Sequence, residues 1–153
     1  MSLIQIKHIS VAKIQAASNI GVLLDAYAQE SALSVMPEPM LDWDIYEALE
    51  ESGGIIAHGA YVDDTLVGFM VIMMCYAAQY SADIGNTMLL FVLPEHRRFG
   101  TGKKLVDSVA EAAFTHGMAA LAIGAPSDSR LAKAAESMGF KETNRVYLRT
   151  NKP

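Results

Sequence analysis

The sequence predicts a single α/β domain in which a mixed sheet of about seven strands is flanked by about four helices. The 153 residues are 52% hydrophobic and 19% charged, which provides enough apolar material for a real core and argues against disorder. Apolar runs of strand-like composition alternate with stretches of helical periodicity. No repeat or linker interrupts the sequence, so we expect one domain over residues 1–153.

The first third of the chain predicts one strand and two helices. A partly alternating apolar run indicates the strand, and Ser10 after it can cap a helix. This helix contains Gly21, where we expect a break or kink. Two prolines then predict a loop, and Asp42 begins a second helix that ends at a Ser-Gly-Gly sequence. In order, these elements are the strand 3–9, the helix 10–33, the loop 34–40 and the helix 42–51.

The middle of the chain predicts three strands. The most apolar stretch is rich in β-branched and aromatic residues and is too short to cross a bilayer as a helix. Asp63 and Asp64 separate it from the preceding apolar run and predict a hairpin turn. A polar connection, whose end can join the next strand, then leads to another hydrophobic run that stops at Pro94. In order, these elements are the strands 55–62 and 66–78, the connection 79–86 and the strand 87–93.

The last third predicts two helices and three further strands. An amphipathic helix ends at His116 and Gly117, and a small apolar strand follows it. A Pro-Ser-Asp sequence opens another helix, which Gly139 stops. A closing hairpin is then expected around Asn144 and Arg145. In order, these elements are the helix 100–115, the strand 118–124, the helix 129–138 and the strands 140–143 and 146–149.

A basic, glycine-rich turn lies between the strand 87–93 and the helix 100–115. The first turn of a helix leaves backbone N–H groups without intrahelical partners, and these donors attract an anion together with the helix dipole. Gly100 and Gly102 allow a close approach of the backbone to a ligand, or a positive φ. The turn therefore predicts a phosphate-binding site, to which four basic side chains add positive charge: Arg97, Arg98, Lys103 and Lys104.

Two common phosphate motifs do not fit this turn. A Walker loop would need a glycine where Arg97 stands and a hydroxyl where Lys104 stands. A dinucleotide fingerprint would need a glycine in place of Leu105. The remaining pattern, Arg97-x-x-Gly100-x-Gly102, resembles the acetyl-CoA-binding signature of the GNAT superfamily of N-acetyltransferases.

Two neighbouring sequences strengthen this resemblance. Val92-Leu93-Pro94-Glu95 matches the Val-x-Pro-Glu that usually precedes the signature, and Ser137-Met138-Gly139-Phe140 stands where members end a helix with Leu-Gly-Phe. The resemblance covers the order of elements from residue 55 to residue 149, and only loosely the segment before. It implies a mostly antiparallel sheet, acetyl-CoA as acyl donor, and a primary amine acceptor that attacks the thioester directly.

The resemblance also implies where the cofactor binds. The strand before the signature would supply main-chain groups to the pantetheine arm and the thioester carbonyl, and residues 98–103 would surround the pyrophosphate. An aspartate stands where relatives often open the next helix with asparagine. The expected cofactor-binding residues are therefore Leu90, Phe91, Val92, Arg97, Arg98, Phe99, Gly100, Thr101, Gly102, Lys103 and Asp128.

The usual acid and base of the family are missing from this sequence. Ala135 stands where many relatives carry the tyrosine that protonates the leaving thiolate, and Asn86 and Ala122 stand where others carry a glutamate base. Proton transfer through water could use another side chain instead, and the candidates are Asp83, Tyr147, Tyr76 and His96. Of these we assign the catalytic role to Asp83 and Tyr147.

Two alternatives to a side-chain proton relay remain open at this point. Catalysis could rest on proximity and on an acceptor that loses its proton easily. Alternatively, the chain could be a non-catalytic domain that binds acyl-CoA for regulation. We favour an active enzyme, because a solvated thiolate leaves without a dedicated acid.

Acidic and basic side chains occupy different halves of the chain. Residues 14–96 contain twelve acidic side chains and no lysine or arginine, whereas residues 97–153 contain ten basic and five acidic ones. This division argues against a nucleic-acid surface, which would need a broad basic face. It predicts an anionic cofactor on one half and a cationic acceptor on the other, such as a polyamine, an aminoglycoside-like amine or a basic peptide.

The remaining features exclude several classes of site. Cys75 is the only cysteine, so an internal disulfide is excluded, and its apolar surroundings favour a core position. The four histidines show no metal-ligand spacing, so we expect no metal. No signal peptide or membrane segment is evident, so we expect a cytoplasmic protein that does not bind membranes. A homodimer is left open.

Overall fold

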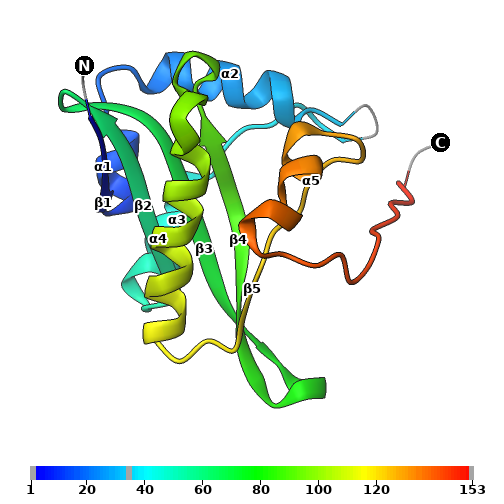
Figure 1. Cartoon of the computed structure of the whole chain (residues 1–153). Helices are drawn as coiled ribbons and strands as arrows, with labels where there is room; N and C mark the ends of the chain where they lie inside the picture. The colour runs from blue at the N-terminus through cyan, green and yellow to red at the C-terminus, as the bar shows by residue number, and fades with distance from the viewer. Residues whose placement is uncertain (1–2, 34–35, 152–153) are drawn as a thin grey trace.

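The computed structural model describes residues 3–33 and 36–151 and places five strands in one sheet, in the order β1-β2-β3-β4-β5 (Figure 1). Neighbouring strands are antiparallel, except that β4 and β5 are parallel. The fold is therefore the expected mixed, mostly antiparallel α/β fold. The strands are β1 (Ile4–His8), β2 (Ile55–Val62), β3 (Thr65–Ala77), β4 (Ala82–Val92) and β5 (Ala120–Ala122).

Helices cover both faces of the sheet (Figure 1). On one face, apolar side chains of the first three helices join a core cluster around Phe69 of β3. On the other face, Leu105 and Val109 of α4 pack on Met70 and neighbouring residues. The α-helices are α1 (Val11–Gln15), α2 (Ile20–Ser31), α3 (Trp43–Glu51), α4 (Thr101–Thr115) and α5 (Arg130–Ala134). Four 3₁₀ turns are η1 (Ala78–Tyr80), η2 (Pro94–His96), η3 (Arg98–Gly100) and η4 (Glu136–Met138).

The middle strands form as predicted. Asp63 and Asp64 both adopt positive φ, 47° and 66°, which is the geometry that a two-residue hairpin turn requires. Most side chains of β2 and β3 are buried, as strands covered on both faces should be. Gly68 on β3 is needed for close packing, because a Cβ there would lie 2.8 Å from the main-chain oxygen of Phe91 on β4.

The helix expected over residues 10–33 is broken, but not at Gly21. Ser10 caps α1, and its side chain accepts a hydrogen bond from the Lys13 N–H (3.1 Å). The chain leaves the helix after Gln15 and re-enters it at Ile20. The Asn19 amide side chain donates to the Leu66 main-chain oxygen (2.9 Å), which fastens this break to β3.

The connection expected over residues 79–86 is mostly strand. The β3–β4 pairing continues outward to Ala77 and Ala82, and only η1 and Ser81 form the turn. In Figure 1 this hairpin extends beyond the rest of the sheet. Polarity here reflects an exposed hairpin rather than a loop.

The two closing strands are not formed, and β5 is shorter than expected. Residues 141–149 are exposed and contain no strand, and β5 spans three residues instead of the seven from 118 to 124. Strand-like composition is not sufficient here, because a strand needs a hydrogen-bonded neighbour and this segment does not lie on the sheet. The described residues therefore form five strands and five α-helices rather than seven and four. Among them, no helix has the length and apolar content needed to cross a membrane.

Candidate active site

One edge of β4 is open along the second half of the strand. β4 pairs with β5 only at Ile84, Gly85 and Asn86, whereas its pairing with β3 continues to Val92. From Thr87 onward, the edge of β4 that faces away from β3 therefore has no strand partner among the described residues.

A β-bulge lies where the two strands separate. On β3, Val71 pairs with Leu89 and the adjacent Ile72 pairs with Thr87, so Met88 is an extra residue on β4. A bulge bends its strand and increases its twist, which separates β4 from β5 beyond this point. The Thr87 hydroxyl oxygen at the bulge is buried and has no hydrogen-bond partner within the described chain.

The direction of the main-chain groups on β4 follows from one hydrogen bond. The Leu93 N–H donates to the Val67 oxygen (2.9 Å), so the main-chain groups of Leu93 point toward β3. In an antiparallel ladder this direction alternates, so Phe91 also faces β3, while Leu90 and Val92 face the open edge. An extended ligand beside β4 would thus meet the N–H and C=O groups of Leu90 and the N–H of Val92.

Arg97, at the first position of the signature, is turned back toward the body of the domain. Its Nε donates to the Val92 main-chain oxygen (2.8 Å), and its Nη2 lies 2.7 Å from both carboxylate oxygens of Glu30 on α2. The guanidinium also lies over the Phe91 ring, 5.5 Å from the ring centre. These contacts fix the glycine-rich turn (residues 97–103) to both β4 and α2. A direct contact between Arg97 and a cofactor remains a prediction.

The glycine-rich turn leaves the N-terminus of α4 uncapped. Phe99 and Gly100 both adopt left-handed backbone angles, with φ of 64° and 74°, and no side chain of residues 3–33 or 36–151 caps the helix. A Cβ at Gly100 or Gly102 would meet no heavy atom within 4 Å, so the space beside both is open. Thr101 is buried, and its hydroxyl donates to the Arg98 oxygen (3.3 Å). The residues present therefore fit a phosphate group held by main-chain N–H donors.

The other expected cofactor residues outside β4 lie in this turn or in the loop after β5. Asp128 lies in the loop after β5. Because β4 and β5 are parallel, this loop and the turn after β4 both follow the carboxyl ends of their strands. Arg98 and Phe99 are exposed, and Lys103 pairs with Asp107 one helical turn later (2.5 Å). The cofactor roles of these side chains remain predictions.

The two residues assigned to catalysis are not brought to this place. Asp83 lies near the start of β4, opposite Tyr76, at the other end of the strand from the glycine-rich turn. Tyr147 is 84% exposed in the segment that leaves the sheet. His96, in η2, is closest in sequence to the turn and is partly exposed. The structure thus does not gather these side chains into one site, and their catalytic roles remain predictions.

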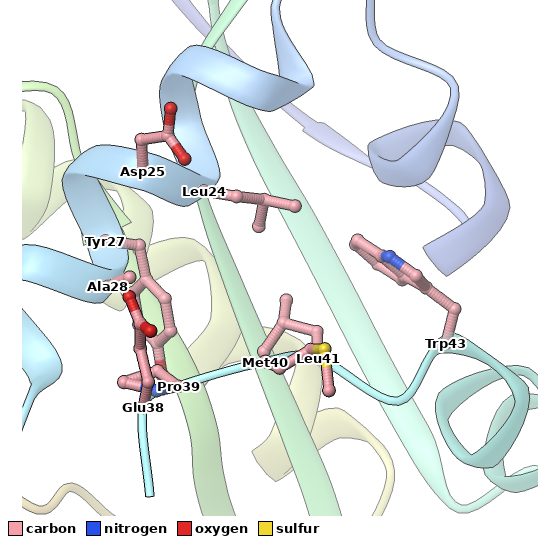
Figure 2. A pocket seen from close by; sticks show the side chains of 9 residues that line it. All are labelled: Leu24, Asp25, Tyr27, Ala28, Glu38, Pro39, Met40, Leu41 and Trp43. Atoms are coloured by element: carbon pink, nitrogen blue, oxygen red, sulfur yellow. The ribbon is translucent and has the colours of Figure 1, made fainter.

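A pocket on the α2–α3 side of the sheet was not predicted from the sequence (Figure 2). Its volume is about 260 Å³, and α2, the loop before α3 and the start of α3 form its walls. Two acidic and two aromatic side chains contribute, and the part of the chain that the structure describes adds no lysine or arginine to the lining. The lining residues are Leu24, Asp25, Tyr27, Ala28, Glu38, Pro39, Met40, Leu41 and Trp43.

Aromatic contacts connect this pocket to β4. The Tyr27 ring meets the Phe91 ring edge-on, with 6.0 Å between their centres. The ring of Tyr46 lies beside that of Trp43, with 6.3 Å between their centres. Burial, and secondarily the electrostatic influence of Tyr27, raises the pKa of the Tyr46 hydroxyl. The signal that could have located the pocket is the chain's only tryptophan within its acidic half.

Comparison with known proteins agrees with this geometry. The model of the acetyltransferase (GNAT) family matches residues 21–140, so the chain belongs to that family. The family's enzymes use acetyl-CoA as donor, and the chain is accordingly an acetyl-CoA-dependent N-acetyltransferase. No curated protein sequence matches the chain.

Several solved structures share the fold. A ribosomal-protein-alanine N-acetyltransferase from Brucella melitensis biovar Abortus 2308 is 24% identical, with a TM-score of 0.72 over 96% of this chain and 98% of that one. An aminoglycoside acetyltransferase from an uncultured soil metagenomic sample, in complex with sisomicin, is 16% identical, with a TM-score of 0.75 over 97% of each chain. Aminoglycoside N-acetyltransferase AAC(6')-Iy in complex with CoA is 18% identical, with a TM-score of 0.72 over 100% and 97%.

Proposed function

We propose that this enzyme transfers the acetyl group of acetyl-CoA to a primary amine of a cationic acceptor. The observation that carries the proposal is that the open edge of β4 is connected both to the glycine-rich turn and to the acidic aromatic pocket. The open edge of β4 runs from Thr87 to Val92, and the glycine-rich turn connects it to the uncapped N-terminus of α4. The Phe91–Tyr27 contact joins β4 to the acidic aromatic pocket. One feature suits an anionic donor and the other a cationic acceptor.

The donor binds along β4 in this proposal. Its pyrophosphate accepts hydrogen bonds from N–H groups at the start of α4, where the open space beside Gly100 and Gly102 admits it. Its pantetheine arm follows the main chain of Leu90 and Val92 on the open edge. The thioester then lies near the bulge at Met88, on the path toward the pocket.

The chemistry needs a neutral amine, a hydrogen-bond donor for the oxyanion and a proton for the leaving thiolate. The amine nitrogen attacks the thioester carbonyl carbon, the C–S bond breaks, and coenzyme A leaves as the thiolate. The ammonium proton of the product passes to water and the thiolate takes a proton from water. We propose this solvent path because no carboxylate or phenol among the assigned candidates lies at the open edge. Positioning of the two substrates then supplies most of the rate enhancement.

The pocket provides the acceptor specificity in this proposal. Asp25 and Glu38 attract a cation, and Tyr27 and Trp43 can pack against its methylene groups or bind it through cation–π contacts. Two of the similar structures are aminoglycoside acetyltransferases, one of them bound to sisomicin. Their names support a polycationic acceptor as the first class to test.

The direct test is thiol release from acetyl-CoA in the presence of polyamines, aminoglycosides, amino acids and N-terminal peptides. We expect turnover with cationic amines and little with acidic ones. Binding of acetyl-CoA without thiol release across the whole panel would instead favour the non-catalytic acyl-CoA-binding alternative.

A further inference from the structure

One ion pair joins the acidic half of the chain to the basic half beside the glycine-rich turn. Arg97 is the first residue of the turn, and its Nη2 lies 2.7 Å from both carboxylate oxygens of Glu30. Glu30 lies in the last turn of α2, and Tyr27 precedes it by three positions. Residues with this spacing share one face of a helix. The pair therefore connects the glycine-rich turn to the face of α2 that contributes Tyr27 to the pocket.

Glu30 stands at a position where its own helix disfavours a carboxylate. The C-terminal end of a helix has a partial negative charge, so an acidic side chain in the last turn is unfavourable and a basic one is favourable. The last turn of α2 contains Glu30 and no basic residue. Arg97 supplies the positive charge from a position 67 residues later in the chain. A residue that is unfavourable for its helix but has a close tertiary partner indicates a role for the pair.

A second set of contacts connects Arg97 to the same helix. Its guanidinium lies 5.5 Å from the centre of the Phe91 ring, and the Phe91 ring meets the Tyr27 ring edge-on, with 6.0 Å between centres. Its Nε donates to the Val92 oxygen (2.8 Å), which fixes the guanidinium to β4. Arg97 is therefore the residue at which the glycine-rich turn, β4 and α2 meet.

The end of α2 has few other contacts that hold it in place. Leu23 is the only buried residue among the twelve residues of α2, all of which the structure describes, whereas α4 buries five of its fifteen. Asn19 fastens the start of α2 to β3, at the opposite end from Glu30. A helix end with little buried apolar surface opens locally at a low free-energy cost. The last turn of α2 therefore depends on Arg97 for its position.

We propose that Arg97 and Glu30 are positioning residues that couple the two substrate sites. This inference rests on the proposed function, in which acetyl-CoA binds at the glycine-rich turn and the acceptor binds in the pocket. A donor that binds the turn favours the arrangement in which Arg97 holds the end of α2. By linkage, formation of the ion pair favours donor binding by the same factor, and α2 in this position completes a wall of the pocket for the acceptor.

The sign of one substitution distinguishes this role from simple electrostatics. Glu30→Ala removes a negative charge, so by charge alone the variant should bind the anionic donor more tightly. Through the loss of the ion pair, we expect it instead to bind acetyl-CoA about fivefold more weakly, at the low end of typical coupling factors because the pair is partly exposed. Isothermal titration calorimetry measures the difference, and equal or tighter binding by the variant would overturn the proposal.

Glu51→Ala is the matched control for this measurement. Glu51 is also an exposed acidic residue in the last turn of a helix, α3, but it does not contact the glycine-rich turn. Its substitution should not weaken the binding of acetyl-CoA. Equal weakening in the two variants would show that the Arg97–Glu30 pair has no particular role.

A double-mutant cycle tests whether the two residues act as one unit. Arg97→Lys keeps the positive charge but loses the planar guanidinium that contacts the Val92 oxygen and Glu30 together. It should weaken the binding of acetyl-CoA at least as much as Glu30→Ala does. The double variant should then bind no more weakly than Arg97→Lys alone, because the pair is already broken. Effects that add would show that the two residues act independently and would overturn the proposal.

Amide hydrogen exchange tests the coupling without a known acceptor. In the wild type, saturating acetyl-CoA should slow exchange at the start of α4 and also in the last turn of α2. In Glu30→Ala, the slowing at α4 should remain and the slowing at α2 should disappear. A purely structural role for the pair would change exchange in the free protein without this dependence on the ligand.

The outcomes of the exchange experiment separate this inference from the proposed function. Slowing at α4 without slowing at α2 in the wild type would overturn the coupling and leave the proposed donor site intact. Slowing at α2 that persists in Glu30→Ala would show that the donor acts on α2 by another route, which also overturns the role of the pair. Absence of slowing at α4 would contradict the proposed donor site itself, and this inference with it.

Discussion

Gly100 is the residue on which the proposed phosphate site depends most directly. It combines a positive φ of 74° with open space on the side where a Cβ would stand, at the uncapped start of α4. Gly100→Glu should therefore place a bulky anion where we propose that phosphate binds. In the wild type, acetyl-CoA at about 100 times its Kd should add ~2.7 kcal/mol of stability, roughly 5–10 °C in Tm, and the variant should lose this shift.

Gly117→Glu is a matched control for this prediction. Gly117 also has a positive φ, 87°, and open space around it, but it follows the other end of α4. Both substitutions bring the same backbone strain and the same charge, so only the position differs. An equal ligand-induced rise in Tm for the two variants would show that the glycine-rich turn is not the phosphate site.

His58 makes a pH-dependent contribution to stability from within the core. Burial, and secondarily His8, lowers its pKa from 6.5 to about 4, and its Nδ1 lies 2.8 Å from the Ser108 hydroxyl. The unfolded chain therefore binds a proton at a higher pH than the folded one, and stability falls as the pH drops below about 6.5. Between pH 7 and pH 5 we expect this residue to account for ~2 kcal/mol. His58→Gln should flatten that part of the urea-unfolding profile, and an unchanged slope would contradict the assignment.

Asp83 and Tyr147 separate a solvent proton path from a dedicated acid or base. If water carries the protons, Asp83→Asn and Tyr147→Phe should each reduce kcat by less than the ~10²–10⁴-fold typical of general acid–base catalysis. A collapse of kcat in either variant, with KM unchanged, would make that residue essential and the solvent path wrong.

Sequence spacing was sufficient to locate the glycine-rich turn, because residues that are neighbours in the sequence form it; its role in binding phosphate remains a prediction. The spacing did not show that Arg97 points away from the open space, since the partner Glu30 lies 67 residues earlier. The pocket was missed for the same reason: Asp25 and Trp43 belong to different helices, and only the fold brings them together.

At the scale of secondary-structure elements, the periodicity of apolar residues correctly predicted the helices and strands whose limits are set by nearby residues. β2, β3, α3 and α4 lie where expected, because hairpin turns, caps and apolar stripes are encoded within each segment. The prediction of two closing strands was wrong, because residues 141–149 can form a strand only beside another strand that supplies hydrogen bonds. The predicted position of the break in the first helix, at Gly21, was wrong. The break lies before Ile20, where the Asn19 side chain binds the main chain of Leu66, a residue distant in the sequence.

The acidic pocket on α2 and the adjoining loop gives a prediction at this scale. Asp25→Asn/Glu38→Gln should raise KM for a cationic amine by about tenfold or more, since removing a charge-assisted hydrogen bond costs ~1.5 kcal/mol. Glu47→Gln/Glu51→Gln on α3 removes the same net charge outside the pocket and should change KM much less. Equal effects in both variants would mean that overall charge, rather than the pocket, selects the acceptor.

At the scale of the whole molecule, acidic and basic side chains occupy different parts of the domain. The acidic residues 14–96 supply α2, α3 and the pocket, while the basic residues from 97 onward supply the glycine-rich turn and α4. In our proposal, this charge distribution draws an anionic donor and a cationic acceptor to different parts of one domain. This division was visible in the sequence, because the sum of charges over long segments does not depend on the details of folding.

The most direct test of this account is the ionic-strength dependence of kcat/KM for the best cationic amine, with a less charged amine as reference. The field of the acidic half is screened beyond ~10 Å at 0.1 M salt, so kcat/KM for the cationic amine should fall steeply as salt is added. The less charged reference should change little. A flat or rising profile for the cationic amine, or a preference for an acidic acceptor, would contradict a cationic acceptor for this enzyme.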